Sequence, residues 1–411
     1  MTATANVPVD TAPPPTLASR MGVLAGEGAL DVFVRARALE SAGRTIVHLE
    51  LGEPDFPTPQ HIVDAGVRAL RDGETRYTPP AGLSDLREAI ATALARRGVA
   101  TSADEIVVAP GAKPVVFYAV LSLVGPGDEV LVPDPGFPIY PSVVRFAGGT
   151  PVPYGLVETS RFLPDVDEIE ARITPRTRVL ILNAPHNPTG GSVDHATLAR
   201  IAELVERHDL TVISDEVYAA ISYDDTDFAP SVAAAPELKH RTILVDGFSK
   251  RFAMTGWRLG YGVIPAPIVP AFVTLTINGH TCTPAFVQRA ALAALTGPAE
   301  PVRAMVAEYR RRRDLIVPGL ATIPGVSCAA PAGAFYAFPN VSAVLRRAGL
   351  STTDFADRLL EDFGVAALSG TAFGSRGEGH LRLSFAASRA ALEAALAAFR
   401  DCVESLTPLS S

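Results

Sequence analysis

The sequence predicts an α/β protein with a mostly parallel sheet and a second, smaller α+β domain. From about Glu105 onward, short runs of β-branched and other apolar residues alternate with segments of helical periodicity. Apolar runs of this kind are typical of strands that are covered on both faces of a parallel sheet. After Pro301, a long helical pattern precedes short strands and further helices, which is typical of α+β architecture. With 411 residues, 48% of them hydrophobic, the chain can build both cores.

The expected elements follow one another along the chain. Strands are expected at EIVVAPG, DEVLVPDPG, TRVLILNAP, LTVISDE, RTILVDGFSK and RLGYGVI, with helices at about 115–124 and 196–207. Beyond these, we expect a long helix through Arg313, paired strands at VSCAA and AFYAFP, and a helix–strand–strand–helix run that ends near Val403. We therefore assign residues 57–290 to a large domain, residues 19–56 and 291–411 to a small domain, and residues 1–18 to a mobile arm rich in Ala, Thr and Pro.

Composition argues against several classes of protein. The net charge is −8, and the densest basic cluster, YRRRRD, falls within a helical pattern, where we expect a solvated helix face and no nucleic-acid partner. Three scattered cysteines show neither a CxxC pair nor metal-ligand spacing, so no disulfide framework and no metal site is expected. We find no pattern of a secretory signal or a membrane span, and we expect a cytoplasmic protein with no membrane partner.

Polar motifs follow the expected strands at their carboxyl ends, where doubly wound sheets bind ligands. These motifs are PGAK, DPGF, NAPHNPTGG, SDEVY and GFSK. In the first, Gly111 precedes a helix and exposes backbone N–H groups to an anion, although a tight turn alone would also use a glycine here. The GxxxxGK[ST] spacing of a P-loop is absent, so a nucleoside triphosphate is not indicated.

Two ionisable residues at these ends indicate imine chemistry. Asp215 follows an apolar strand, where a buried carboxylate requires a cationic partner such as a protonated pyridine nitrogen; an acid here could equally cap a helix. Lys250 is one of three lysines among 36 cationic residues. Desolvated lysine can lose its proton and act as a nucleophile, whereas arginine cannot. A lysine retained at this position in an arginine-rich chain therefore indicates a Schiff base.

The stretch GFSKRFAMTGWRLG resembles the pyridoxal-phosphate attachment motif of class I/II aminotransferases. Further segments are similar to motifs of that family in its order and approximate spacing: LGEPDFPTP, RYTPPAGLSDLREAI, DPGFPIY, NAPHNPTGG, SDEVY and HLRLSFA. The resemblance extends from about residue 20 to the C-terminus. It implies an aspartate aminotransferase-like enzyme of fold type I with a seven-stranded type of sheet. It also implies a homodimer with shared active sites that bind pyridoxal 5′-phosphate between the two domains.

The resemblance implies roles for the residues that would contact the cofactor ring. Lys250 would form the imine with the cofactor and later carry the proton of the reaction. Asp215 would pair with the pyridinium nitrogen. Tyr218 and Asn187 would hydrogen-bond the 3′ oxygen of the ring, and Phe137 would stack on the ring.

The phosphate and the substrate would be bound by a second set of residues. The resemblance assigns the phosphate to Arg258, to the backbone N–H groups of Ala112 and Lys113, to Tyr77 of the other subunit and to Ser249, although the family often uses a hydroxyl at the position of Gly247. Arg382 would bind the α-carboxylate of the substrate, for which a planar guanidinium is well suited. The backbone of Gly52 would approach that carboxylate, and Asn187 would also contact the substrate.

The implied reaction moves an amino group from an L-amino acid to a 2-oxo acid. A lyase, synthase or oxidase could use the same cofactor site, and these alternatives stay open. Lys113 is a candidate for binding a distal substrate carboxylate, or it is an ordinary solvated helix residue; Glu27 and Ala29 stand where dicarboxylate-specific relatives carry small hydroxyl residues. A non-catalytic regulator is not expected, because Lys250 and its partners are all present.

Overall fold

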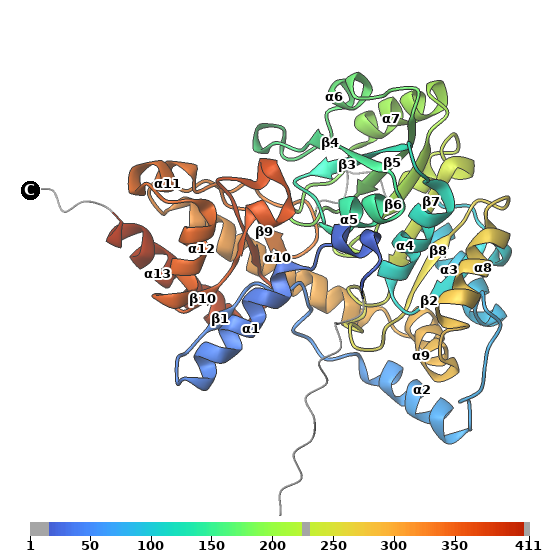
Figure 1. Ribbon diagram of the computed structural model, residues 1–411. Coiled ribbons are helices and arrows are strands. Elements are labelled where there is room, and N and C mark those ends of the chain that lie inside the picture. The colour runs from blue at the N-terminus through green and yellow to red at the C-terminus, as the bar shows by residue number, and fades with distance from the viewer. Residues whose placement is uncertain (1–15, 224–230, 407–411) are drawn as a thin grey trace, which may run out of the picture.

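A seven-stranded sheet forms the centre of the larger part of the molecule (Figure 1). The computed structural model describes residues 16–223 and 231–406, so most of the arm expected over residues 1–18 lies outside the described residues. The strand order is β2-β8-β7-β6-β5-β3-β4. The bounds are β2 (Ile106–Ala109), β3 (Glu129–Asp134), β4 (Thr150–Gly155), β5 (Thr177–Asn183), β6 (Thr211–Asp215), β7 (Thr242–Gly247) and β8 (Gly260–Val263).

Most neighbours in this sheet are parallel. The pairs β3–β4, β3–β5, β5–β6 and β6–β7 run parallel, whereas β8 is antiparallel to both β2 and β7. Parallel neighbours place their carboxyl ends at one edge, and the residues Asn183, Asp215 and Gly247 therefore end three adjacent strands on the same side. The mixed, mainly parallel sheet confirms the predicted fold class.

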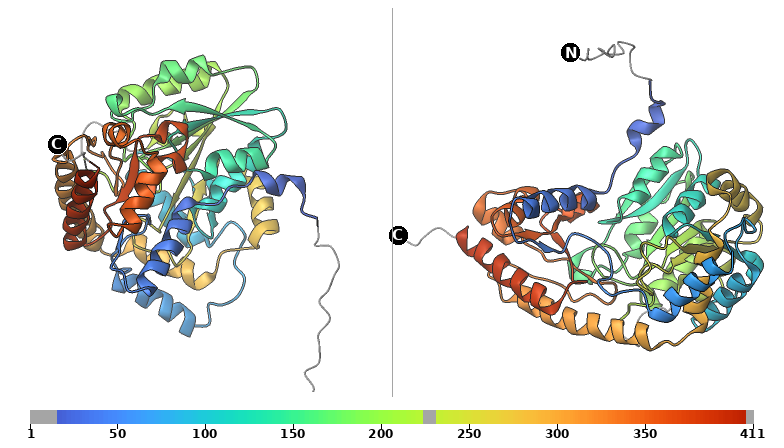
Figure 2. Two further views of the ribbon diagram at one scale, coloured as in Figure 1. Left: turned by 60° about the vertical axis from the view of Figure 1, so that its left-hand side comes forward. Right: turned by 90° about the horizontal axis from the view of Figure 1, so that it is seen from below.

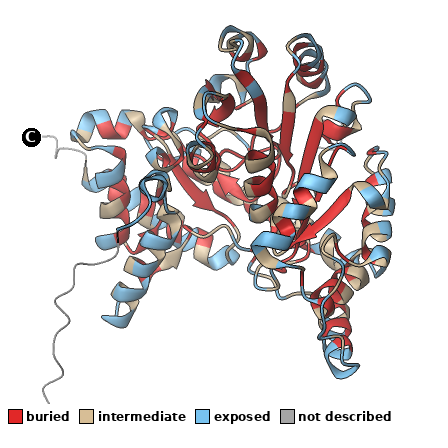
Figure 3. Cartoon of the chain, turned by 45° about the vertical axis from the view of Figure 1, so that its right-hand side comes forward, coloured by how far each residue is buried: buried red, intermediate tan, exposed pale blue. Residues whose placement is uncertain are grey.

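Helices cover both faces of the sheet, and its strands other than β4 are buried along most of their length (Figure 3). Val130 and Val132 of β3 pack into one core with α4, α5 and α8, while Leu131 between them packs into another with α6 and α7. This alternation follows from the two-residue period of a strand. The helices are α2 (Gln60–Arg71), α3 (Ser84–Ala95), α4 (Ala112–Leu123), α5 (Ile139–Phe146), α6 (Val166–Ala171), α7 (His195–Arg207), α8 (Val269–His280) and α9 (Ala285–Thr296).

Strand β4 is the one strand of this sheet that the sequence analysis does not predict. It contains Pro151 and Pro153 and pairs only with β3, at the edge of the sheet. Proline lacks the N–H group that a strand inside the sheet would donate, so it is tolerated in an edge strand such as β4. Because prolines usually argue against a strand, the sequence pattern did not predict one here. The helices predicted at about 115–124 and 196–207 correspond to α4 and α7.

A smaller layer of helices and short strands lies beside this sheet, on the left of Figure 1. Strand β1 pairs in parallel with β10, which brings the segment near Val47 against the C-terminal part of the chain. The long α10 passes beneath both parts in the right view of Figure 2. The elements are α1 (Gly28–Ser41), β1 (Val47–His48), α10 (Glu300–Ala321), β9 (Tyr336–Ala337), α11 (Ser342–Ala348), α12 (Thr352–Glu361), β10 (Val365–Ala366), β11 (Leu368–Ser369), β12 (Leu381–Ser384) and α13 (Arg389–Ser405).

The paired strands expected at VSCAA and AFYAFP are not formed. Strand β9 pairs with β12 instead, and the VSCAA segment contributes only an isolated bridge between Ser327 and Asn340. The N–H groups of Ala332, between the two segments, and of Ala334, which begins the second, donate to carbonyl groups elsewhere in the chain, each at 2.8 Å. Backbone donors used in this way cannot extend a hairpin ladder.

The solvated face expected for YRRRRD is wrong at Arg312 and at Arg313, whose side chain is only 15% exposed. Arg311 is exposed, but Arg312 is buried and donates through Nη1 to Asp55 Oδ1 at 2.7 Å. Its guanidinium carbon lies 5.0 Å from the centroid of the Phe56 ring. This contact attaches the segment before α2 to α10. Because α10 passes along both layers of the molecule, the consecutive arginines on this helix cannot all face solvent.

Within the described ranges, no helix is long and apolar enough to span a membrane. The same part of the chain contains no group of three or more His, Cys, Asp or Glu residues placed to bind a metal ion. The domain bounds of 19–56 with 291–411 and of 57–290 stay a prediction.

Candidate active site

A cavity of about 610 Å³ opens at the carboxyl edge of the seven-stranded sheet. The structure brings together nearly all the site residues predicted from the sequence, and the exception is Tyr77, whose side chain is 87% exposed and does not line the cavity. Those that line it are Gly52, Ala112, Lys113, Phe137, Asn187, Asp215, Tyr218, Ser249, Lys250, Arg258 and Arg382. They come from segments as far apart as Gly52 and Arg382.

Lys250 lies on the connection between β7 and β8. Because β8 runs antiparallel to β7, the chain must turn back at the carboxyl edge, and this turn places Lys250 in the cavity. Its Nζ donates a hydrogen bond to the carbonyl oxygen of Gly52. Burial lowers the pKa of Lys250 to about 8, and the neighbouring guanidinium groups of Arg382 and Arg258 act in the same direction. The neutral amine, which is the nucleophilic form, is therefore much more accessible near neutral pH than in an ordinary lysine.

Asp215 ends β6 and is buried at the bottom of the cavity. Its Oδ2 accepts from the hydroxyl of Tyr140 at 2.8 Å and its Oδ1 accepts from the N–H of Val217 at 3.4 Å. Burial raises the pKa of Asp215 to about 6. Within the described residues no ion pair joins this carboxylate to a cation. A ligand that presents a protonated ring nitrogen would supply the missing positive charge.

Two asparagines link Asp215 to the opposite wall. Asn183 donates through Nδ2 to the carbonyl oxygen of Asp215 at 2.8 Å and accepts from the N–H of Asn187 at 2.9 Å. Asn187 Oδ1 in turn accepts from Arg382 Nη1 at 3.2 Å. Because its oxygen faces Arg382, the amide nitrogen of Asn187 is the group that can donate to a ligand.

Arg382 is a buried cation on β12. Its Nη2 donates to the carbonyl oxygen of Glu50, and its guanidinium carbon lies 4.7 Å from the ring centroid of Tyr336 and 5.0 Å from that of Phe373. Its Nε is buried and has no hydrogen-bond partner among the described residues. A buried guanidinium held by neutral acceptors lacks a counter-ion, so a ligand carboxylate would complete this site.

Tyrosine hydroxyls form the wall between Lys250 and Arg382. The hydroxyl groups of Tyr218 and Tyr336 lie 2.6 Å apart, and burial raises the pKa of Tyr218 well above its usual range, so it stays a neutral hydrogen-bonding group. Gly52 passes this wall closely: a Cβ added to it would lie 2.0 Å from Tyr336 Oη. Only glycine fits at that position.

Sequence reasoning did not assign Tyr336 or Tyr140 to the site. Tyr140 ends the motif DPGFPIY and could have been found there, since its ring follows the loop that carries Phe137. Tyr336 lies in a short strand of a different layer, and no local pattern indicates its contact with Tyr218.

The other end of the cavity is suited to an anion. Gly111, with φ of +104°, precedes α4, so the first N–H groups of this helix face the cavity at Ala112 and Lys113. A Cβ on Gly111 would lie 2.5 Å from Arg258 Nη2, which shows how closely the guanidinium approaches the helix start. Arg258 Nη1 donates to the carbonyl oxygen of Thr255 at 2.8 Å. Ser249 also lines the cavity and adds a hydroxyl.

These features fit pyridoxal phosphate. The helix start and Arg258 match a phosphate group, Asp215 matches a pyridinium nitrogen, and the amine of Lys250 lines the same cavity. Phe137 lies at 5.6 Å from Tyr140 between ring centroids and offers an aromatic face.

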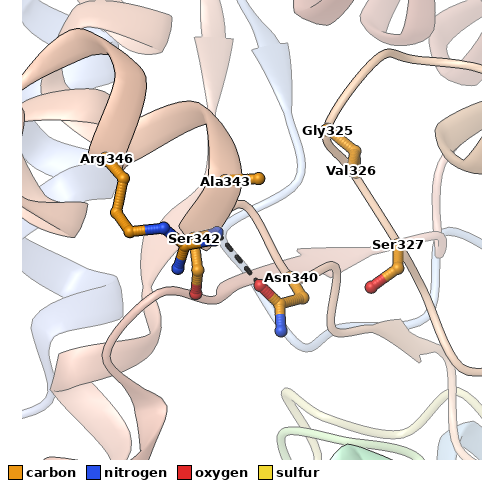
Figure 4. A pocket seen from close by; sticks show the side chains of 7 residues that line it. All are labelled: Gly325, Val326, Ser327, Asn340, Ser342, Ala343 and Arg346. Atoms are coloured by element: carbon orange, nitrogen blue, oxygen red, sulfur yellow. Dashed lines mark hydrogen bonds between the residues drawn. The ribbon is translucent and has the colours of Figure 1, made fainter.

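A second, more open hollow lies between the turn at Gly325 and the start of α11 (Figure 4). There the N–H of Ser342 donates to Asn340 Oδ1 at 3.0 Å. Arg346 is the single charged side chain among the residues that line this hollow. It therefore lacks the set of acids, bases and donors found in the larger cavity.

A sheet of this order with a lysine amine and a buried carboxylate at its carboxyl edge defines the class of fold type I enzymes that use pyridoxal phosphate. Residues 44–399 match the family described as aminotransferase class I and II, and the chain belongs to this family.

Individual relatives match over nearly their whole length. An aspartate aminotransferase from Geobacillus stearothermophilus is 38% identical over 382 residues, which cover 92% of this chain and 97% of that protein. The crystal structure of the aspartate aminotransferase from Rhizobium meliloti superposes with a TM-score of 0.90 at 36% identity, covering 95% and 99% of the two chains. An aromatic aminotransferase from Pyrococcus horikoshii OT3 gives a TM-score of 0.84 at 40% identity, covering 88% and 96%.

The protein is thus a pyridoxal-phosphate-dependent amino-acid aminotransferase (EC 2.6.1). The predicted family, fold type, reaction and cofactor are confirmed by these relatives. Their named activities favour transamination over the lyase, synthase and oxidase alternatives.

Proposed function

We propose that the protein transfers the amino group of an L-amino acid to a 2-oxo acid with the residues of this cavity in the following roles. Lys250 binds the cofactor through Nζ and carries the proton that leaves the substrate Cα. Asp215 holds a proton on the ring nitrogen by providing the negative charge beside it. Tyr218 and Asn187 donate hydrogen bonds to the ring oxygen. When bound, pyridoxal phosphate supplies an electron-withdrawing ring that makes the substrate Cα–H acidic.

The remaining residues position the two ligands. Arg258, Ser249 and the N–H groups of Ala112 and Lys113 bind the phosphate, and Phe137 packs on the ring. Arg382 binds the α-carboxylate, with Asn187 beside it and the backbone of Gly52 closing the approach. The unpartnered Nε of Arg382 supports this role, because it is a buried donor that no group among the described residues satisfies.

The observation that carries the proposal is the desolvated amine of Lys250 in one cavity with Asp215 and Arg382. Lys250→Ala should abolish the visible absorbance of the lysine-bound cofactor and lower transamination by at least about 10²-fold, because the proton carrier is lost. Amino-donor and 2-oxo-acid panels followed by product analysis measure the second effect, and the panel should include acidic, aromatic and aliphatic donors.

Lys239→Ala is the matched control, since Lys239 lies at the surface 3.7 Å from Glu105. Its absorbance and activity should equal those of the unaltered protein. Transamination that survives in Lys250→Ala would show that another group carries the proton, and accumulation of products without transfer of nitrogen to a 2-oxo acid would instead indicate a lyase or oxidase.

We further propose a cytoplasmic homodimer in which each subunit contributes Tyr77 to the cofactor site of the other. The exposure of Tyr77 supports this arrangement, because a tyrosine left in solvent by one subunit is available to a second copy of the chain. The cytoplasmic location stays a prediction.

A further inference from the structure

Lys113 and Glu27 form an ion pair on the wall of the active-site cavity. Lys113 lies in the first turn of α4, and Glu27 immediately precedes α1, so two segments 86 positions apart meet here. Both residues line the cavity. The side chain of Lys113 is 48% exposed and that of Glu27 is 24% exposed, so the pair is partly desolvated.

The other charged residues of the cavity already have partners or tasks, an assignment that rests on the proposed function. Four cations line the cavity, and Lys250, Arg258 and Arg382 are assigned to the cofactor and the α-carboxylate. Lys113 is then the cation that remains for a substrate side chain. Its charge is balanced by Glu27, and another lining carboxylate, Glu53, accepts a hydrogen bond from Thr255.

The surroundings of the ion pair are apolar. Ala29 and Leu30 of α1 and Val116 of α4 line the same wall, and Lys113 Nζ lies 5.6 Å from the ring centroid of Phe137. An apolar or aromatic side chain can pack against this wall while the ion pair stays intact. A side-chain carboxylate must instead displace Glu27 from Lys113 and remain beside a second negative charge.

We propose that Glu27 is a specificity-determining residue that occupies Lys113 and thereby selects donors with neutral apolar or aromatic side chains over dicarboxylic donors. Specificity is then set by an unfavourable encounter with the rejected substrate as well as by packing with the accepted one. Glu27 pairs with the side chain of Lys113, whereas only the backbone N–H of Lys113 is assigned to the phosphate, so the effect of Glu27 is directed to the side-chain end of the substrate.

The test compares Glu27→Gln with the unaltered holoenzyme. The unaltered enzyme should have a higher kcat/KM for phenylalanine or leucine than for aspartate. Glu27→Gln should raise kcat/KM for aspartate by about 10-fold or more and change that for leucine by less than about 3-fold, because Lys113 is released while the apolar wall is kept. The double variant Glu27→Gln with Lys113→Met should lose the gain, which shows that it acts through Lys113.

Binding gives a second readout that does not depend on turnover. Succinate, an unreactive dicarboxylate, should bind to Glu27→Gln at least about 10-fold more tightly than to the unaltered enzyme in isothermal titration calorimetry. Asp31→Asn is the matched control, since Asp31 is an exposed acid in the first turn of the same helix and does not line the cavity. Its donor preference and succinate affinity should be unchanged.

Several outcomes would overturn the proposal. These are a parallel change for all donors in Glu27→Gln, a preference of the unaltered enzyme for aspartate, or a loss confined to lysine and ornithine, which would make Glu27 a binding site for a basic side chain. If the unaltered enzyme transaminates no donor in the panel, the proposed function fails as well. Efficient turnover that is indifferent to Glu27 contradicts only the present inference.

Discussion

At the scale of single residues, His186 illustrates how burial alone makes stability depend on pH. It lies in the loop after β5, where Nδ1 is 2.8 Å from Thr189 Oγ1 and Nε2 has no hydrogen-bond partner among the described residues. Burial lowers the pKa of His186 to about 3. In the unfolded chain a histidine takes up a proton near pH 6.5. As the pH falls from 6.5 toward 3, the unfolded state therefore binds more protons than the native state, and the stability of the native state decreases.

His186→Asn should remove this pH dependence. The unaltered protein should lose about 2 kcal/mol of unfolding free energy from this residue between pH 7 and pH 5, and the variant should not. Denaturant unfolding at the two pH values measures the free energy of unfolding of each protein. The advantage of the unaltered protein over the variant should be smaller by that amount at pH 5 than at pH 7. The exposed His240→Asn serves as control and should run parallel to the unaltered protein. A parallel profile for His186→Asn would contradict the prediction.

The site residues that could be predicted from the sequence are those that lie in short contiguous motifs. Lys250, Asp215 and Asn187 each lie at or soon after the end of a predicted strand, so their common edge could be inferred from the expectation of a mostly parallel sheet. The contact of Tyr336 with Tyr218 joins residues 118 positions apart and depends on how two layers pack. The ion pair of Glu27 with Lys113 likewise joins residues that are far apart, 86 positions, in the sequence. The sequence showed only that Glu27 stands where dicarboxylate-specific relatives carry a small hydroxyl residue.

At the scale of elements, Arg97 stabilises the carboxyl ends of two central strands. Its Nη1 donates to Asp246 Oδ2 at 2.7 Å, next to the end of β7, and its Nη2 donates to Glu216, the residue after β6. Both acids are buried, and Asp246 also accepts from Tyr261 Oη at 3.1 Å. Asp215 ends one of these strands, and Lys250 lies in the connection after the other. The ion pairs of Arg97 therefore help to position both residues.

Arg97→Met should lower the free energy of unfolding by about 3–5 kcal/mol, because it leaves two buried carboxylates without a cation. Chemical denaturation measures this loss. Arg200→Met is the matched control, since its partner Asp167 and its own side chain are largely exposed, and it should cost less than about 1 kcal/mol. Equal losses in the two variants would mean that the ion pairs of Arg97 are solvated in the native protein.

The strands themselves were predictable because burial on both faces leaves a nearly continuous apolar run. Strand β4 was not, since its two prolines are tolerated only by its edge position, which depends on the rest of the sheet. The strand pair expected near Ser327 does not form, because backbone N–H groups between and at the edge of the two segments donate hydrogen bonds to residues elsewhere in the chain. Such tertiary contacts cannot be read from the local sequence.

At the scale of the whole molecule, the position of Tyr77 makes the dimer testable. If Tyr77 binds the phosphate in the other subunit, Tyr77→Phe should weaken binding of pyridoxal phosphate by about 10- to 100-fold, the value of a hydrogen bond to a charged group. Hybrid dimers of Tyr77→Phe and Lys250→Ala subunits give the decisive comparison. Their one intact lysine then lies opposite an intact Tyr77, and cofactor affinity measured by activity should return to that of the unaltered protein.

Sedimentation of the unaltered protein provides the accompanying control, with a mass of twice the 43.2 kDa chain expected. A monomer, or hybrids whose affinity equals that of Tyr77→Phe alone, would place the tyrosine outside the active site.

In the proposed assignment, the cofactor and the substrate carboxylate are bound by different layers of the molecule. The proposed cofactor residues lie on the seven-stranded sheet and its loops, whereas Arg382 lies on β12 of a separate three-stranded sheet. Substitutions that tilt the smaller sheet should therefore alter the affinity for carboxylates while leaving cofactor occupancy intact. Substrate recognition could therefore be altered in this protein from the smaller sheet alone, with the proposed cofactor residues left as they are.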